Sequence, residues 1–286
     1  MAFGKKIELS IGAGGSGLLI SDLNIVFNIE KSTNSVNNTA KFTIYGAKEN
    51  TISQILRGEN NVIFKAGYQD ENNLATIFIG TITKSISKKD GQTVSTEIDC
   101  IDFGSNSTKF ETFDIGMSYK SSTPLTSVIN EVASIFGMVV NGISNISDIV
   151  LNNGFVFVGS GSNVLKMITK SLDTYGIGLY FDGSEMVLYK KDGRTSQFGI
   201  VTINKNSGLI GSVEDITDEN NSDDIKNNTP IKKRVKFSSL LNSKLKPNSL
   251  IDLNYNGKKG LFFIDKITFS GDNMSGEFKC DIEAVE

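Results

Sequence analysis

Two glycine-rich segments have spacings that could bind phosphate groups. Gly12, Gly14 and Gly17 match the pattern GxGxxG, but a dinucleotide site needs a following helix whose N-terminus faces the pyrophosphate. The next segment, residues 18–29, becomes strand-like, so we expect a flexible hairpin loop. Residues 159–163 lie between a strand and a helix but lack the Gly-Lys-Ser/Thr ending of a phosphate-binding loop. There we predict a tight turn and a helix cap.

The acidic segment of residues 214–229 carries carboxylates that could bind a cation. The candidates are Asp215, Asp218, Glu219, Asp223 and Asp224. Calcium loops place oxygen ligands at alternate positions, with a glycine at the bend and a glutamate at the end, and this order is missing here. We expect a mobile, solvated loop, and weak cation binding stays open as an alternative.

One basic cluster is visible, formed by Lys232, Lys233, Arg234 and Lys236. Nucleic-acid sites usually interleave such charges with stacking aromatic residues over a wide face, and Phe237 alone does not make one. We interpret the cluster as the solvated start of a strand or as an ion-pairing contact between subunits.

Paired acids and cysteines complete the candidates for chemistry. Asp99 with Asp102 and Asp281 with Glu283 lie within strand patterns; the second pair projects to one face, which is routine on a solvated strand. The two cysteines, Cys100 and Cys280, lie in alternating runs and are expected to be buried or half-buried free thiols. They are too few for a CxxC metal site.

Histidine is absent from all 286 residues, which removes the usual general base and the commonest metal ligand. Ser-His-Asp, Cys-His and HExxH chemistry are therefore excluded together. Carboxylate-pair or lysine chemistry stays possible. We predict no catalytic, cofactor-binding or metal-binding residue, no cofactor, and no enzymatic activity.

Composition places the chain among ordinary globular proteins. Hydrophobic residues make up 38% and charged residues 21%, and the formal net charge is −3, which argues against an electrostatic nucleic-acid binder. No apolar run approaches the roughly 18 residues of a membrane helix, and the N-terminus has no apolar signal-peptide core. We expect folding in a cytoplasm.

The elements that would position these residues fall into three segments. Residues 1–120 read as strands, with period-two alternation at 23–30 and further runs at 40–45, 62–68, 76–87 and 94–103. Lys89-Asp90-Gly91 predicts a hairpin turn, and a short helix is expected at 51–56. Several antiparallel strands without long helices favour a barrel or a sandwich.

Residues 121–194 read as an α/β insert with two helices and a hairpin. Thr123 is the predicted cap of the first helix, Pro124 its first residue and Gly137 its left-handed stop. The second helix is predicted after residues 161–163, and a hairpin turning at Asp182-Gly183 follows.

Residues 195–286 return to strands, which are predicted at 199–203, 233–237, 250–255, 261–269 and 276–285. The fold class is therefore mainly β (α+β): two β-barrels flank a small α/β insert. No short repeat is visible, although the two outer segments could be copies of one architecture.

Several sequence segments, in the order in which they follow along the chain, resemble segments of the hub proteins of phage-tail baseplates. The early segments are residues 38–47, 62–68 and 77–82; the middle ones are residues 123–137 and 164–176. The late ones are residues 207–212, 235–242 and 246–251, followed by the turn at 269–273. Together they cover nearly the whole chain and resemble the hub family of the late-control D proteins and the Mu-like contractile tails.

The resemblance implies a structural role in a virion tail baseplate that is assembled in the host cytoplasm. Hubs of this family form homotrimers in which each subunit contributes two barrels like a tail-tube subunit. The resulting six barrel units join the six-fold tube to the three-fold central spike and surround the genome-ejection channel. Implied partners are other copies of the chain, the spike and tube proteins, and beyond these the tape measure and wedge proteins. DNA is met only in passage through the lumen.

Physical arguments agree with such a ring. Edge strands are a hazard in a monomer but join neighbours in an assembly. A mildly acidic wall would not hold DNA phosphates, which is our hypothesis for the channel. Two alternatives stay open: another tube-like or distal-tail structural protein, and a carboxylate-based cell-wall hydrolase.

Overall fold

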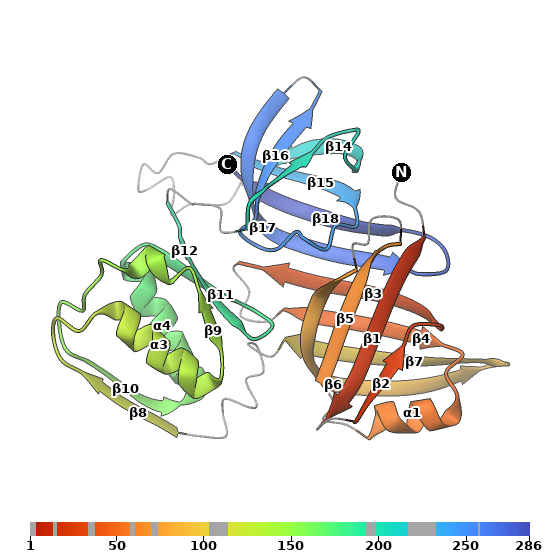
Figure 1. Cartoon of the computed structure of the whole chain (residues 1–286), viewed down its shortest axis with the longest axis horizontal. Coiled ribbons are helices and arrows are strands. Elements are labelled where there is room, and N and C mark those ends of the chain that lie inside the picture. The colour runs from red at the N-terminus through yellow and green to blue at the C-terminus, as the bar shows by residue number, and fades with distance from the viewer. Residues whose placement is uncertain are drawn as a thin grey trace.

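The computed structural model describes residues 4–13, 16–33, 38–57, 61–69, 74–102, 114–192, 198–216, 233–256 and 258–286. These residues form one 13-stranded sheet, one two-stranded sheet and one three-stranded sheet. Figure 1 shows two strand-rich halves beside a unit that carries the two longer helices. The predicted fold class, mainly β with a small α/β part, is confirmed.

The first half contains seven strands and one short helix. They are β1 (Lys5–Ala13), β2 (Ser16–Ile20), β3 (Asn24–Ser32), β4 (Thr39–Tyr45), α1 (Glu49–Leu56), β5 (Asn61–Tyr68), β6 (Ala75–Asp90) and β7 (Thr93–Asp102). Strand β3 buries every second side chain because successive residues of a strand point to opposite faces. The ring of Phe64 lies 4.8 Å from Phe27 and 4.9 Å from Phe42, so β5 packs face to face against β3 and β4.

The second half contains the six C-terminal strands. They are β13 (Ile200–Ile203), β14 (Leu209–Ile216), β15 (Arg234–Leu240), β16 (Leu250–Tyr255), β17 (Lys258–Asp272) and β18 (Phe278–Val285). Their spatial order β14-β15-β18-β17-β16 repeats the order β3-β4-β7-β6-β5 of the first half, strand for strand in chain order. The halves differ at the next strand, since β13 runs parallel to β16 whereas β1 runs antiparallel to β5. The outer segments thus share one architecture.

The two halves are joined by direct strand pairing. Strands β3 and β17 pair antiparallel from Lys266↔Ser32 to Asp272↔Val26, which makes the 13-stranded sheet continuous from one half to the other. One buried apolar cluster likewise extends through both halves. The junction therefore has the hydrogen bonding of a sheet interior and the packing of a core.

The remaining unit has its own apolar core and contains short strands and helices. Its elements are β8 (Asp114–Tyr119), α3 (Leu125–Phe136), β9 (Val139–Asn141), the 3₁₀ helix η2 (Ile143–Ile146), β10 (Phe155–Ser160), α4 (Gly161–Thr174), β11 (Ile177–Asp182) and β12 (Glu185–Lys190). Strand β8 falls within the segment 1–120 that was assigned to the first barrel, yet its partner is β10. We therefore describe β8 with this unit, called the insert from here on.

The start of α3 differs from the prediction. The helix begins at Leu125, so Pro124 occupies the N-cap position, and no side chain makes a capping hydrogen bond. The Thr123 hydroxyl instead donates to the carbonyl of Lys120, and the Leu125 N–H donates to the carbonyl of Ile149. The pairing of this segment with the chain near residue 150 replaces the expected cap. Gly137 ends the helix with φ 65°, as predicted.

Other predicted elements are present with shifted bounds. Helix α4 begins at Gly161 and not after residue 163, and Ser160 makes no side-chain cap. Both predicted hairpins form, with Gly91 and Gly183 at positive φ in their turns. The acidic segment was predicted to be a loop from residue 214, but β14 continues to Ile216. The rest of that segment, residues 217–229, lies outside the described residues.

Candidate functional site: the continuous sheet and its junctions

The outer face of the continuous sheet is polar and carries charges of both signs. At the junction the ammonium of Lys266 on β17 lies 3.3 Å from the carboxylate of Glu30 on β3. Further along the same face Lys236 pairs with Glu283 at 3.9 Å. Alternation places these side chains opposite the apolar core, so the face is solvated across both halves.

The turn between β17 and β18 fastens the second half onto the first. The side-chain amide of Asn273 continues the ladder: its oxygen accepts from the Ile25 N–H at 2.8 Å and its nitrogen donates to the Leu23 carbonyl at 2.9 Å. Asn24 donates to a carboxylate oxygen of Asp272 at 2.7 Å.

The carboxylate of Asp272 is held in its charged form by the turn. Burial raises its pKa. Hydrogen bonds from the backbone N–H groups of Met274 and Ser275 and from the side chain of Asn24 lower it by more, so the pKa lies below the ordinary value. Charge-assisted bonds of this kind are among the stronger hydrogen bonds in proteins. They fix the turn that faces β3.

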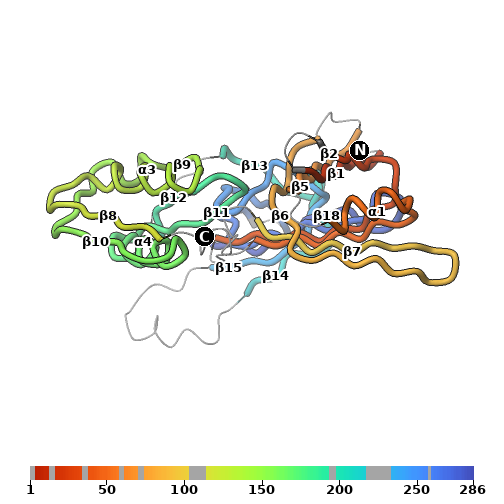
Figure 2. The backbone as a smooth tube through the Cα atoms, turned by 90° about the horizontal axis from the view of Figure 1, so that it is seen from below, coloured from red at the N-terminus to blue at the C-terminus, as the bar shows by residue number. Residues whose placement is uncertain are grey.

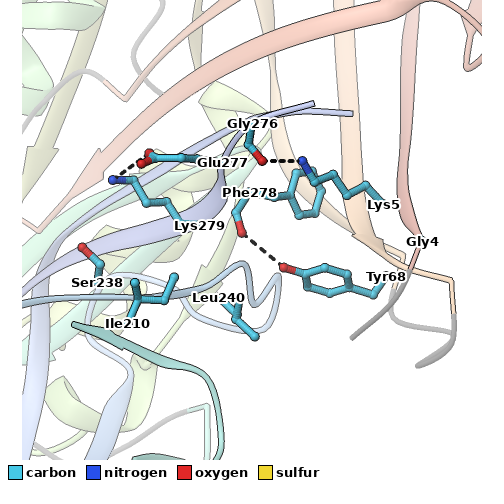
Figure 3. A pocket seen from close by; sticks show the side chains of 10 residues that line it. All are labelled: Gly4, Lys5, Tyr68, Ile210, Ser238, Leu240, Gly276, Glu277, Phe278 and Lys279. Carbon is cyan, nitrogen blue, oxygen red and sulfur yellow. Dashed lines mark hydrogen bonds and ion pairs between the residues drawn. The ribbon is translucent and has the colours of Figure 1, made fainter. Parts of the chain in front are cut away.

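A groove of about 450 Å³ lies where the two halves meet beside this turn. Figure 3 shows Lys5 and Tyr68 of the first half reaching carbonyl groups of the second half. The Lys5 ammonium donates to the Gly276 carbonyl at 2.7 Å, and the Tyr68 hydroxyl donates to the Phe278 carbonyl at 3.2 Å. These contacts make the groove a part of the junction.

A buried ion cluster connects the insert to both halves. Asp182, at the end of β11, lies 2.5 Å from the ammonium of Lys31 on β3 and 2.9 Å from that of Lys246, which precedes β16. Asp182 and Lys31 are both buried. One carboxylate of the insert therefore bridges one lysine from each half.

The electrostatics of this cluster favour the charged carboxylate. Burial alone raises the pKa of Asp182, but the charges of Lys31 and then Lys246 outweigh it and lower the pKa from 3.8 to about 2. For Lys246, burial lowers the pKa, and the Asp182 carboxylate more than compensates, so the pKa is raised. The two lysines of this ion triad thus keep the buried Asp182 carboxylate in its charged form.

Further hydrogen bonds surround the triad. Asp102, which is fully buried at the end of β7, accepts from the side chain of Asn38 at 3.0 Å and from the Gly183 N–H at 2.8 Å. Asn38 also donates to the Phe181 carbonyl at 2.6 Å, and the Tyr180 hydroxyl donates to the Pro247 carbonyl at 2.7 Å. The β11–β12 hairpin is thereby held by polar contacts to both halves.

The structure separates the residues that the sequence suggested for chemistry. Gly12 and Gly17 face each other in the β1–β2 hairpin, as predicted, and Gly14 lies outside the described residues. Residues 159–163 form the end of β10 and the first turn of α4, and the two segments are in different parts of the fold. Neither arrangement leads from a strand into a helix through a phosphate-binding loop.

The charged candidates are dispersed into ion pairs. Of the acidic segment, Asp215 accepts from the Tyr255 hydroxyl at 3.1 Å, and Asp218, Glu219, Asp223 and Asp224 lie outside the described residues. Of the basic cluster, Lys233 lies 3.7 Å from Asp215 and Arg234 lies 3.6 Å from Asp265, and Lys232 is not among the described residues. The described cations thus face carboxylates of the same chain.

The acid pairs and the thiols occupy structural positions. Asp281 and Glu283 share the outer face of β18, as predicted, and Asp281 accepts from the Ser238 hydroxyl at 2.5 Å. Cys100 and Cys280 are free and buried, which confirms the prediction. Burial raises the pKa of both thiols, that of Cys280 to about 12, so they stay protonated. In the described part of the chain, no group of three or more acidic or cysteine residues could hold a metal ion.

Sequence reasoning missed the residues that make the junctions. Lys31 received no assignment, Asn38 entered only as part of the stretch 38–47, and Asp182 and Asn273 were predicted to lie in turns. Their partners across the junctions lie 64 to 250 positions away, so no local pattern could reveal them: Asn273 bonds across 248 residues and Lys31 across 151. Lys31 alone gave a signal, because it occupies the buried phase of the alternation in β3.

No helix of the described residues is long and apolar enough to span a membrane.

Solved structures with a similar fold are tail proteins. The tail protein from Neisseria meningitidis MC58 has a TM-score of 0.67 at 9% identity, covering 99% of this chain and 97% of that one. The 43 kDa tail protein of prophage MuSo2 from Shewanella oneidensis has a TM-score of 0.65 at 11% identity, covering 98% and 96%. An E. coli protein, described as a type VI secretion component with structural similarity to the T4 tail proteins gp27 and gp5, has a TM-score of 0.60 at 12% identity, covering 97% and 76%.

The chain therefore has the fold of these tail and secretion-system proteins. No curated protein sequence matches the chain at a significant level. The model of the family described as "Baseplate hub gp41" matches residues 6–256, and the chain belongs to this baseplate hub family. The resemblance found in the sequence is confirmed.

Proposed function

We propose that three copies of the chain form the ring at the centre of a tail baseplate, in which each copy supplies two tube-like units. The ring joins the six-fold tail tube to the three-fold central spike and surrounds the channel through which DNA passes. The observation that carries this proposal is the repeat of one strand order in both halves, joined by the β3–β17 ladder. Two equivalent units in each of three subunits can meet six-fold and three-fold neighbours alike.

The outer face of the sheet supports the channel part of the proposal. Lys266 stands beside Glu30 and Lys236 beside Glu283, so the positive charge of these two described lysines is compensated and would hold DNA phosphates weakly. The subunit acts structurally and without catalysis, since the described charged groups of its junctions are engaged in holding the halves together. It would be assembled in the host cytoplasm and function in the virion baseplate, with tape measure and wedge proteins as further neighbours.

Mass photometry with negative-stain imaging of the purified protein tests the assembly. We expect particles of three times 31.0 kDa, alone or with spike and tube proteins, and a ring with a central opening. A monomer that fails to assemble even with both partners would overturn the proposal. A six-subunit ring or a long tube would favour the alternative of a tube-like or distal-tail protein, and peptidoglycan turnover by the purified chain would favour a cell-wall hydrolase.

A further inference from the structure

The ladder that joins the two halves has an unoccupied counterpart. In the second half, the same edge of β17 pairs first with β16, up to Phe263, and then with β3, from Lys266 onward. In the first half, β6 is the counterpart of β17, and its edge pairs with β5 only up to Thr81. Beyond Thr81 no described strand pairs with that edge. Figure 2 shows the β6–β7 hairpin extending away from the rest of the molecule.

The strand that would fill this edge also exists. Strand β14 is the counterpart of β3, and it is the last strand of its end of the sheet, paired with β15 and with no other described strand. Within the chain, β3 uses the edge facing away from β4 to pair with β17. The corresponding edge of β14 is thus left over in the second half, just as the edge of β6 is in the first.

We infer that β14 of one copy adds antiparallel to the edge of β6 of a second copy, repeating between copies the β3–β17 ladder within the chain. This inference rests on the proposed ring, and it names the surface by which the ring closes. The contact is head to tail, so three copies would carry three such ladders alternating with three internal ones.

The repeat also fixes the register. In the first half one row of paired residues crosses the sheet as Lys84–Asp99–Lys41–Asn28. The matching row of the second half is Lys266–Glu283–Lys236–Glu214, and Lys84 and Lys266 each follow a bulge in their strand. Both rows therefore place a lysine, an acid and a lysine on the same three strands.

The internal ladder pairs Asn28 with Ser270, which lies four residues after Lys266. The same step from Lys84 leads to Lys88, so Glu214 of one copy would face Lys88 of the next. Two residues along, Ile216 would face Ile86, and both are half-buried in the single chain. Opposite charges directly across a ladder stabilise strand pairing, and so do apolar pairs.

The charges of the two edges are complementary beyond this pair. The outer part of β6 carries Lys84, Lys88 and Lys89, all exposed, together with Asp90, and Lys88 lies 3.0 Å from Glu97 on β7. The end of β14 carries Glu214 and Asp215, the latter 3.7 Å from Lys233. Long-range attraction between a basic and an acidic edge favours the proposed docking over the pairing of two β6 or two β14 edges.

Cysteine cross-linking in the full-length protein tests the register. The E214C/K88C variant should form covalent dimers and trimers under mild oxidation, and each single variant should not form trimers. The native thiols give little background, because both are buried. The matched control S212C/K88C moves one thiol by two residues and should cross-link at least about fivefold less, since the spacing grows by roughly 7 Å.

Charge reversal gives an independent test. E214K and K88E should each weaken trimer formation by roughly tenfold, and the E214K/K88E double variant should restore it. The control K166E reverses an exposed charge on α4 of the insert and should leave assembly unchanged. Unchanged melting temperatures would show that every variant folds.

The outcomes separate this inference from the proposed function. Trimers that form without the E214C/K88C cross-link and without charge-swap rescue would overturn the strand pairing and leave the ring standing. A protein that stays monomeric with spike and tube proteins and gives no cross-link would overturn both.

Discussion

The two halves present the same strand order but differ in what their shared edges meet. In the second half the edge of β17 is covered by β3, and Phe269 and Ile29 face each other in the interior at the junction. In the first half the equivalent edge of β6 carries lysines and meets no described strand. One edge has thus become part of a core, while its counterpart keeps the charge that prevents an open edge from pairing nonspecifically.

The difference teaches how one architecture can serve both folding and assembly. An edge that pairs within the chain can be apolar because it is covered as soon as the chain folds. An edge that pairs only with a second copy is exposed to solvent before assembly. Charged side chains on such an edge suppress nonspecific strand pairing.

The largest effect is expected from removing a ring at the internal junction. Phe27→Ala should lower the free energy of unfolding by about 3–5 kcal/mol, because the ring is buried and packs against Phe64 and Phe278. Urea unfolding measures this. Val213→Ala, at the equivalent position of β14, should cost less than about 1.5 kcal/mol, since Val213 is only half-buried. Equal losses of unfolding free energy for the two variants would contradict the different roles assigned to β3 and β14.

Removing the insert's carboxylate should have the next largest effect. Asp182→Asn leaves the buried Lys31 without its counter-charge and should cost about 3 kcal/mol. Glu283→Gln on the outer face should stay within about 1 kcal/mol, because solvent screens its pair with Lys236. Comparing both variants by chemical unfolding shows whether the halves are fastened by the interior triad or by the face; a larger loss for Glu283→Gln would contradict this assignment.

The same carboxylate predicts a pH dependence. The pKa of Asp182 is depressed in the folded chain to about 2, so its contribution is present above the unfolded pKa of about 4. As the pH falls from about 4 to 2, the contribution of about 2 kcal/mol should be lost. Unfolding measured across this window should show a shallower decline for Asp182→Asn than for the native protein. Identical pH profiles would contradict the ion triad.

A smaller effect is expected at the closest approach of the junction. A Cβ at Gly271 would lie 2.7 Å from the ring of Phe278 and 3.0 Å from that of Phe27, so Gly271→Ala should cost about 1–2 kcal/mol through overpacking. The equivalent position on β6 is Lys89, which is exposed, and Lys89→Ala should change the melting temperature little. Unaltered stability of Gly271→Ala would mean that the junction relaxes easily.

Much of the fold followed from local patterns. Alternation in residues 23–30 predicted β3, and the apolar spacing after Pro124 predicted α3, because burial of one face imposes a period on the sequence. The predicted helix cap was wrong at Thr123: its hydroxyl donates to the nearby Lys120 carbonyl, and Pro124 forms an isolated bridge with Val150. Strand β8 showed the same limit, since nothing local reveals that its partner is β10 and not a barrel strand.

The sequence alone excluded histidine-dependent catalysis and a CxxC metal site, because folding cannot supply residue types that the chain lacks. The alternating pattern likewise determined which side of each strand is apolar. Tertiary structure decided everything that depends on which strands become neighbours: the β3–β17 ladder, the Lys31–Asp182–Lys246 triad, and the edges of β6 and β14 that pair with no described strand. The physical reason is that a strand's period specifies its faces, whereas its hydrogen-bonding edges are chemically alike in every sequence.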